Sequence, residues 1–181
     1  VLDIKTGDLK PHSKDYFTLF KVNCDYDKES INKFKGSKFE GYLKTTFKNN
    51  SKMITLISEV FGASLLPNPK KMQKAIYLLG EGSNGKSLFL NVLQALHGGI
   101  VGGVELKNID DDKFGLADMV GVKLNIDDDA TGTRITETGN FKKITSGGMV
   151  RVQNKFEKAT NEILQVLMVV NLNKMPTTTD K

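Results

Sequence analysis

A glycine-rich stretch, "GEGSNGKS" at residues 80–87, constrains the fold of this chain more than any other feature. It follows the continuous apolar run Ala75–Leu79, which predicts a central strand, and it precedes apolar residues at helical spacing between Leu88 and Leu96. Glycines let a loop curl with its amides inward, and the N-terminus of a following helix adds further N–H donors. A strand, a glycine loop and a helix in this order predict a site for nucleotide phosphates. We expect ATP to be held by residues of this segment, namely Gly80, Glu81, Gly82, Ser83, Asn84, Gly85, Lys86, Ser87 and Leu88.

Two side chains at the end of the loop have the chemistry that a nucleoside triphosphate requires. Lys86 can reach the β- and γ-phosphates, and the Ser87 hydroxyl can be a ligand of Mg²⁺. The alternative is a glycine-rich turn without function. The whole motif rarely occurs by chance in 181 residues, and a flanking strand and helix make chance rarer still. The sequence therefore favours nucleotide binding.

An acidic cluster, Asp127-Asp128-Asp129, follows a second strand candidate in which Val122, Leu124 and Ile126 alternate with polar residues. Parallel sheets place ligand chemistry at the carboxyl ends of their strands, so we predict a catalytic role for this cluster. The alternative is a solvated turn, because Asp110-Asp111-Asp112 shows that the chain also has acidic turns. Which aspartates act stays open, since a shift of one residue exchanges the faces of a strand.

A third strand candidate, Gln165–Asn171, ends in the stretch Asn171-Leu172-Asn173-Lys174-Met175-Pro176. An asparagine at this strand end could donate a hydrogen bond to the γ-phosphate or to the attacking water. The alternative is an ordinary turn asparagine ahead of a proline.

The chain divides by pattern into two parts. Residues 71–181 alternate strands and helices, which predicts an α/β fold with a parallel sheet flanked by helices. Residues 1–70 predict a small, mainly helical subdomain, although strand formers are frequent at 16–22. The prolines of Leu66–Lys71 mark the boundary near residue 70. Helices are expected over 39–47 and 53–61.

Composition limits the class of protein and of partner. Hydrophobic residues make up 39% and charged residues 26%, a globular mix, and no apolar run is long enough to span a membrane. The net charge of +5 suits a polyanionic partner. The lone cysteine, Cys24, indicates a reducing compartment, and we expect it to be buried as a small apolar residue.

Loop, acidic strand end and terminal asparagine, in this order, resemble the superfamily 3 helicases, which are AAA+ ring ATPases of small viruses, phages and plasmids. Residues 82–87 are close to the loop variant of the phage/plasmid primase–helicase family, related to the poxvirus-type helicase–primase. Residues 128–131 look like the acidic motif of viral members, and 141–148 are similar to the family's segment after that motif. Residues 2–12, with 16–17 and 25–27, resemble the small helical domain that precedes the ATPase in that family.

The resemblance implies roles for single residues. Asp128 would be the Mg²⁺ ligand together with Ser87, Asp129 would activate water, and Asn173 would sense the γ-phosphate, so that Lys86, Asp129 and Asn173 are the expected catalytic residues. It also implies a replicative DNA helicase that assembles into a ring, a hexamer by expectation, acts on single-stranded or forked DNA, and works in the cytoplasm of a bacterial host or a virus-infected cell, away from membranes.

These helicases carry a β-hairpin between acidic motif and sensor, and here that region is Met149–Ile163. Basic side chains on such a hairpin pair with DNA phosphates, so the expected contacts are Arg151, Lys155 and Lys158. Phe156 could stack on a base. The alternative is a solvated hairpin with Phe156 in the core.

One element of the family pattern is missing. The arginine that a neighbouring subunit contributes lies beyond the sensor, where neither Arg134 nor Arg151 stands, so the sequence reads as a fragment that hydrolyses ATP slowly by itself. Two other functions stay open. One is a small-molecule kinase, although two arginines offer little for a lid, and the other is a nucleotide-dependent assembly module.

Overall fold

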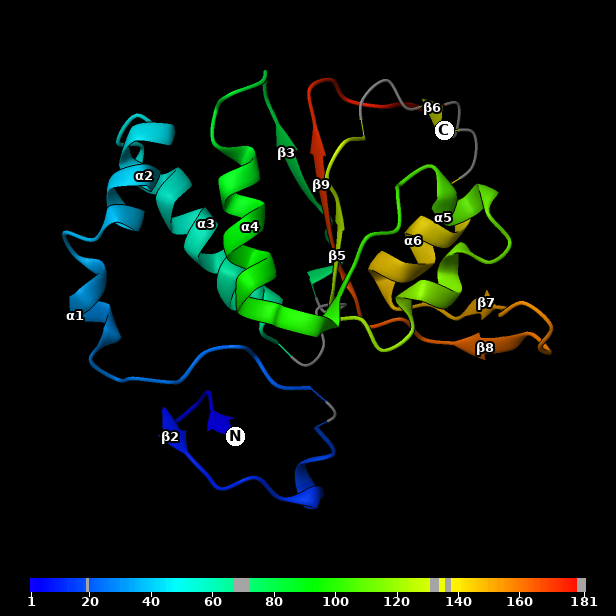
Figure 1. The fold of residues 1–181 in the computed structure, drawn as a ribbon, viewed down its shortest axis with the longest axis horizontal. Helices are drawn as coiled ribbons and strands as arrows, with labels where there is room; N and C mark the ends of the chain where they lie inside the picture. The colour runs from blue at the N-terminus through cyan, green and yellow to red at the C-terminus, as the bar shows by residue number, and fades with distance from the viewer. Residues whose placement is uncertain (19, 67–71, 131–133, 136–137, 179–181) are drawn as a thin grey trace. The chain divides into compact units, whose positions relative to one another are not determined.

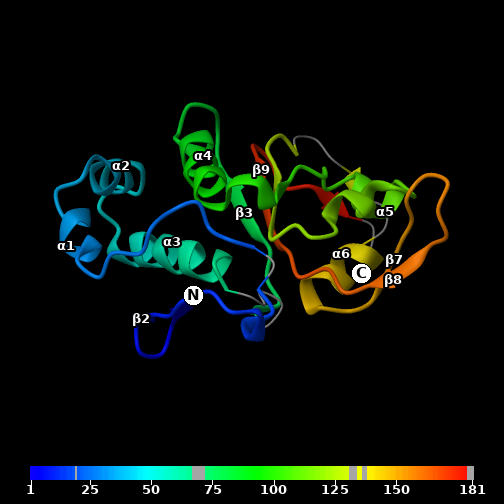
Figure 2. The same ribbon diagram turned by 60° about the horizontal axis from the view of Figure 1, so that its bottom comes forward.

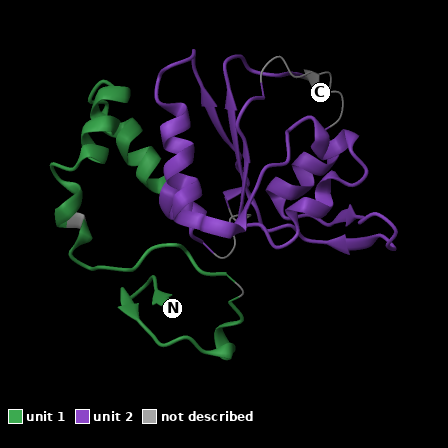
Figure 3. Ribbon diagram, viewed as in Figure 1, with its two compact units in different colours: residues 1–60 green, residues 61–181 purple. Residues whose placement is uncertain are grey.

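The computed structural model describes residues 1–18, 20–66, 72–130, 134–135 and 138–178 (Figure 1). The chain forms two compact units, Val1–Val60 and Phe61–Lys181 (Figure 3). The domain boundary that the sequence predicts near residue 70 lies outside the described residues and stays a prediction, as do Thr131 of the acidic stretch and Lys181.

The first unit holds a short antiparallel pair and helices. Strands β1 (Leu2–Asp3) and β2 (Asp8–Leu9) pair antiparallel, and η1 (Lys14–Tyr16), α1 (Ser30–Phe34), α2 (Lys38–Thr46) and the first part of α3 (Ser51–Ser64) follow. Ser37 begins α2, because its side chain accepts a hydrogen bond from the Glu40 N–H, while the Glu40 carboxylate accepts one from the Gly36 N–H. This is the reciprocal bonding of a helix start with Ser and Glu three residues apart.

The strand formers at 16–18 and 20–22 form no strand, since Tyr16 belongs to η1 and Phe17 adopts a left-handed conformation with φ of 47°. One expectation for this unit is wrong. Cys24 is exposed and not buried, because it lies in an irregular segment next to the charged residues Asp25 and Asp27.

A parallel sheet forms the centre of the second unit. Its order is β3-β9-β5-β4, with bounds of Ile76–Leu79, Leu167–Leu172, Leu124–Asp127 and Val101–Gly102. The strand that leads into the glycine loop, β3, is therefore an edge strand of the sheet formed by the described residues and not a central one. The last strand in the chain, β9, lies between the loop strand and the acidic strand.

Helices lie on both sides of this sheet, with α4 (Lys86–His97) on one side and α5 (Asn108–Asp111) and α6 (Gly139–Ser146) on the other (Figures 1 and 2). The expected α/β fold with a parallel sheet flanked by helices is confirmed. The remaining elements are η3 (Gly98–Ile100), η4 (Gly115–Met119), β6 (Arg134–Ile135), the hairpin strands β7 (Val150–Val152) and β8 (Thr160–Glu162), and β10 (Thr177–Thr178), which pairs parallel with β6.

Alternate residues of β9 pack on opposite sides. Met168, Val170 and Leu172 join a core to which β7, α5 and α6 also contribute, and each is at most 1% exposed. On the other side, α4 buries Phe89, Leu90 and Leu93. His97 ends α4 in the core, where its ring nitrogens lie 2.9 Å from the Leu93 carbonyl oxygen and 3.1 Å from that of Ser64 in α3. Burial on both faces explains why β9 is a continuous apolar run.

Among the described residues, no helix combines the length and the apolar character that crossing a membrane requires.

Candidate functional site

The glycine loop connects β3 to α4, and its backbone has the curl that the sequence predicts. Ser83 and Gly85 have positive φ angles of 59° and 89°, and Gly85 is the N-cap of α4. Gly85 makes no side-chain cap of the helix, and the N–H groups at a helix start are suited to bind an anion. A Cβ atom at Gly80 would meet the side-chain amide of Asn84, so a larger residue there would force the Asn84 side chain to move.

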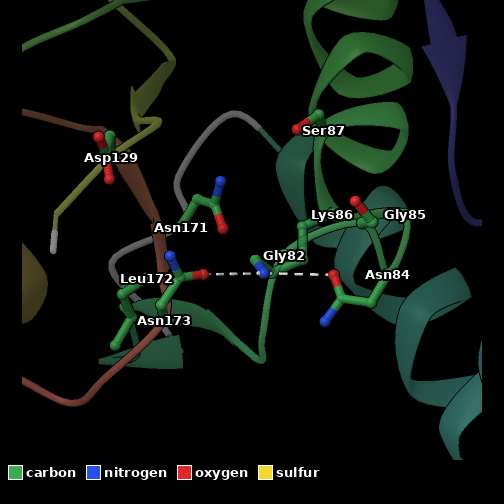
Figure 4. A pocket seen from close by; sticks show the side chains of 10 residues that line it. Gly82, Asn84, Gly85, Lys86, Ser87, Asp129, Asn171, Leu172 and Asn173 are labelled. Carbon is green, nitrogen blue, oxygen red and sulfur yellow. Dashed lines mark hydrogen bonds between the residues drawn. The ribbon is translucent and has the colours of Figure 1, made fainter.

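The Lys86 side chain folds back over this loop. Its ammonium donates hydrogen bonds to the carbonyl oxygens of Gly80 at 2.5 Å and Glu81 at 2.8 Å. It also lies 3.2 Å from Oδ1 of Asn84 and 3.3 Å from Oδ1 of Asn173, and Figure 4 shows it between these two side chains. A cation surrounded by neutral oxygens in this way is suited to exchange them for anionic ones.

A cavity of about 330 Å³ opens in front of the loop (Figure 4). Asp129, Asn171, Leu172 and Asn173 line it from the carboxyl ends of β5 and β9, opposite residues 82–87 of the loop. Three of the residues expected to hold ATP are not part of this lining, namely Gly80, Glu81 and Leu88, and neither is the expected metal ligand Asp128. Gly80 and Glu81 instead bind Lys86 through their carbonyl groups, and Leu88 is 47% exposed on the first turn of α4.

The three aspartates of the acidic cluster have different surroundings. Asp127 is the last residue of β5 and is buried, and its carboxylate accepts a hydrogen bond from the Leu106 N–H at 2.7 Å. Burial raises the pKa of the Asp127 carboxyl above its ordinary value, and the bond from Leu106 acts against that increase. In the register of the sheet Asp127 pairs with Val170, so it points to the core side, away from α4. Asp127 therefore secures the segment after β4 and does not face the cavity.

Asp128 and Asp129 are exposed beyond the end of β5. The Asp128 carbonyl and carboxylate oxygens lie 2.8 and 3.2 Å from Nδ2 of Asn171. The Ala130 N–H donates to the Asn171 carbonyl, which continues the pairing of the two chains past the strand ends. Asp129 lines the cavity, and Asp128 is held beside it.

The sequence predicts an asparagine at the end of β9, and the family resemblance selects Asn173, so Asn171 was not among the expected site residues. The signal was present, because residues two apart in a strand share a face. Both asparagines line the cavity, and they bind different groups: Asn171 the acidic strand end, Asn173 the loop lysine.

The β-hairpin expected between Met149 and Ile163 is confirmed, with Val150 opposite Glu162 and Val152 opposite Thr160. Arg151, Lys155 and Lys158 are exposed on it, and none of them lines the cavity. Phe156 is fully exposed at φ of 67°, so the alternative that placed it in the core is wrong.

Residues 78–181, more than half of the chain, match a family that is described as a family of unknown function, DUF5906. The chain belongs to DUF5906. All residues that line the cavity lie within the segment that matches this family. A search of curated proteins found no match to the chain.

Solved structures similar to this DUF5906 chain include apo structures of the NrS-1 C terminal region. The A form aligns with a TM-score of 0.61 at 13% identity, over 77% of this chain and 33% of its own length. A second structure of that region gives a TM-score of 0.57 at 12% identity, over 75% of this chain and 32% of its own. The likeness shows a shared fold, and this chain spans about a third of the length of those structures. A JCV helicase with a bound acetamide compound aligns over 83% of this chain and 52% of its own at 15% identity, but its TM-score of 0.40 is too low to carry an argument.

The residues of the DUF5906 cavity fit a magnesium nucleotide. Anionic phosphates would find the Lys86 ammonium and the start of α4. Magnesium prefers oxygen ligands and keeps several waters, so a Ser87 hydroxyl, a carboxylate and phosphate oxygens suffice to hold it. Asn171 and Asn173 add side-chain amides to this lining, and amides of this kind can hydrogen-bond to phosphate oxygens or to a carboxylate.

Proposed function

We propose that this DUF5906 chain is the ATP-binding motor core of a replicative DNA helicase of the superfamily 3, AAA+ type, from a phage, a plasmid or a related mobile element. The observation that carries the proposal is the cavity in which the glycine loop, Asp129, Asn171 and Asn173 meet. The strand order adds support, because β9 brings the asparagines between the loop and the acidic strand. The full-length protein would form a ring, a hexamer by expectation, in the cytoplasm of a bacterial host or a virus-infected cell.

Each residue has a role in this proposal. Lys86 would leave the carbonyl groups of Gly80 and Glu81 for the β- and γ-phosphates, since a phosphate oxygen carries a full negative charge and a carbonyl oxygen only a partial one. Ser87 and Asp128 would hold Mg²⁺, which neutralises phosphate charge when bound. The exposed carboxylate of Asp129 would accept the proton of the attacking water. Asn173 would orient the γ-phosphate and Lys86 together.

The test of nucleotide binding uses Lys86→Ala, with Lys52→Ala on the exposed face of α3 as the matched loss of one positive charge. Equilibrium titration with a fluorescent ATP analogue and Mg²⁺ is the measurement. Lys86→Ala should lose at least about tenfold in affinity, equivalent to about 1.4 kcal/mol, whereas Lys52→Ala should bind like the unmodified chain. Equal affinity of the two variants, or no binding by the unmodified chain, would remove the basis of the proposal.

Contact of the hairpin with DNA is a separate part of the proposal. Arg151, Lys155 and Lys158 would bind phosphates of single-stranded or forked DNA, and Phe156 would stack on a base. Phe156→Ala should weaken binding of single-stranded DNA by about 1–3 kcal/mol. Phe17→Ala is a well-matched control, because Phe17 is also exposed, at 89%, and also has a positive φ. A kinase or an assembly module would leave both variants equal in DNA binding.

A further inference from the structure

The two asparagines at the end of β9 contact opposite sides of the cavity. Nδ2 of Asn171 donates to the Asp128 carbonyl oxygen at 2.8 Å and lies 3.2 Å from a carboxylate oxygen of the same residue. Oδ1 of Asn173 accepts from the Lys86 ammonium at 3.3 Å. The two amides therefore have separate partners, although they stand two residues apart on one strand end.

The orientation of the Asn171 amide follows from its partners. Both Asp128 atoms are acceptors when the carboxylate is ionised, so only the NH₂ end of the amide can face them. Oδ1 must then point the other way, where it is buried and has no hydrogen-bond partner among the described residues. An acceptor that stays unpaired in this way costs about 1–3 kcal/mol. In the view of Figure 4 the Asn171 amide lies between Asp129 and the loop.

We propose that Asn171 is a positioning residue for the metal: its NH₂ group holds the Asp128 carboxylate in place for Mg²⁺. This inference rests on the proposed function. Groups that hold a metal ligand in this way change metal affinity by about 10–100-fold when removed. Asn173 has no part in this task, because its amide serves the loop lysine.

The experiment compares Asn171→Leu and Asn171→Ala with Asn173→Leu as the matched control. Leucine keeps the volume of the side chain and alanine keeps the cavity open, and both remove the donor to Asp128. A fluorescent ATP analogue is titrated in EDTA and then with rising Mg²⁺, and bound Mn²⁺ in place of Mg²⁺ is counted by electron paramagnetic resonance. Both Asn171 variants should bind the analogue normally in EDTA but require about 10–100-fold more metal. Asn173→Leu should weaken binding in EDTA and keep the metal dependence of the unmodified chain.

The outcomes separate the two proposals. If the unmodified chain binds no nucleotide, the proposed function fails and this inference fails with it. If the unmodified chain binds nucleotide and both Asn171 variants show its metal dependence, the inference alone is overturned. Normal binding in EDTA shows that a variant is folded, and weaker binding in EDTA by both Asn171 variants also contradicts the proposal, because the role would then not be confined to the metal.

Discussion

The acidic residues at 110–112 are predicted to contribute to stability through Asp110, which lies in α5. The Asp110 carboxylate accepts the backbone N–H groups of Asn140 at 2.7 Å and Phe141 at 3.4 Å, at the start of α6, whose own N-cap Thr138 makes no side-chain cap. Asp110 thus caps a helix 30 residues away in sequence. Loss of a cap costs about 1 kcal/mol, and loss of a negative charge at a helix N-terminus about 0.3–1 kcal/mol more. Asp110→Ala should therefore lower the free energy of unfolding by about 1.5 kcal/mol.

Urea unfolding followed by circular dichroism is the assay, with Asp111→Ala as control. Asp111 also lies in α5 but is exposed, so its replacement should change stability by no more than about 0.5 kcal/mol. Replacing aspartate by alanine raises the helix propensity of α5 equally in both variants, so this effect cancels when their free energies of unfolding are compared. Asp110→Asn keeps an acceptor for the Asn140 N–H and loses the charge, so it should fall between the two. Equal stability of the two alanine variants would refute the assignment of Asp110 as the cap of α6.

The remaining predictions concern the loop and the acidic strand. The folded-state pKa of Asp127 is raised by burial, so this group's contribution to stability should decline as pH rises from about 4, the unfolded value, through the folded one. Asp127→Asn, which keeps an acceptor for the Leu106 N–H, should remove that decline in urea titrations at several pH values, and an unchanged pH dependence would contradict it. Gly80→Ala should displace the exposed Asn84 side chain from its place beside the Lys86 ammonium and weaken nucleotide binding. Gly99→Ala, whose Cβ would meet nothing, should leave binding unchanged, and equal affinities in the two variants would exclude the steric argument.

Local patterns were enough to predict the elements around the site. The loop needs a positive φ at Gly85, and the helix after it needs an apolar stripe. Strand β9 needs apolar residues on both faces. Neighbouring residues in the sequence are enough to predict each of these features, but they do not predict the order of the strands. The apolar run before the loop predicts a buried strand equally well at the centre or at the edge, and the structure puts β3 at the edge.

The two aspartate triplets show what a local sequence pattern cannot predict. Both are runs of three acidic residues, and only the apolar strand before Asp127 distinguishes them in the sequence. In the structure Asp110 and Asp127 have the same structural role. The carboxylate of each accepts a hydrogen bond from the backbone of a segment that is distant along the chain. The difference arises from the neighbours of β5: because β9 lies beside it, the residues after Asp127 meet Asn171 and the cavity. The chemistry of a residue at this site therefore depends on the strand beside it. The sequence places Asn171 at a strand end, but its partner Asp128 could be assigned only once β9 was known to lie beside β5.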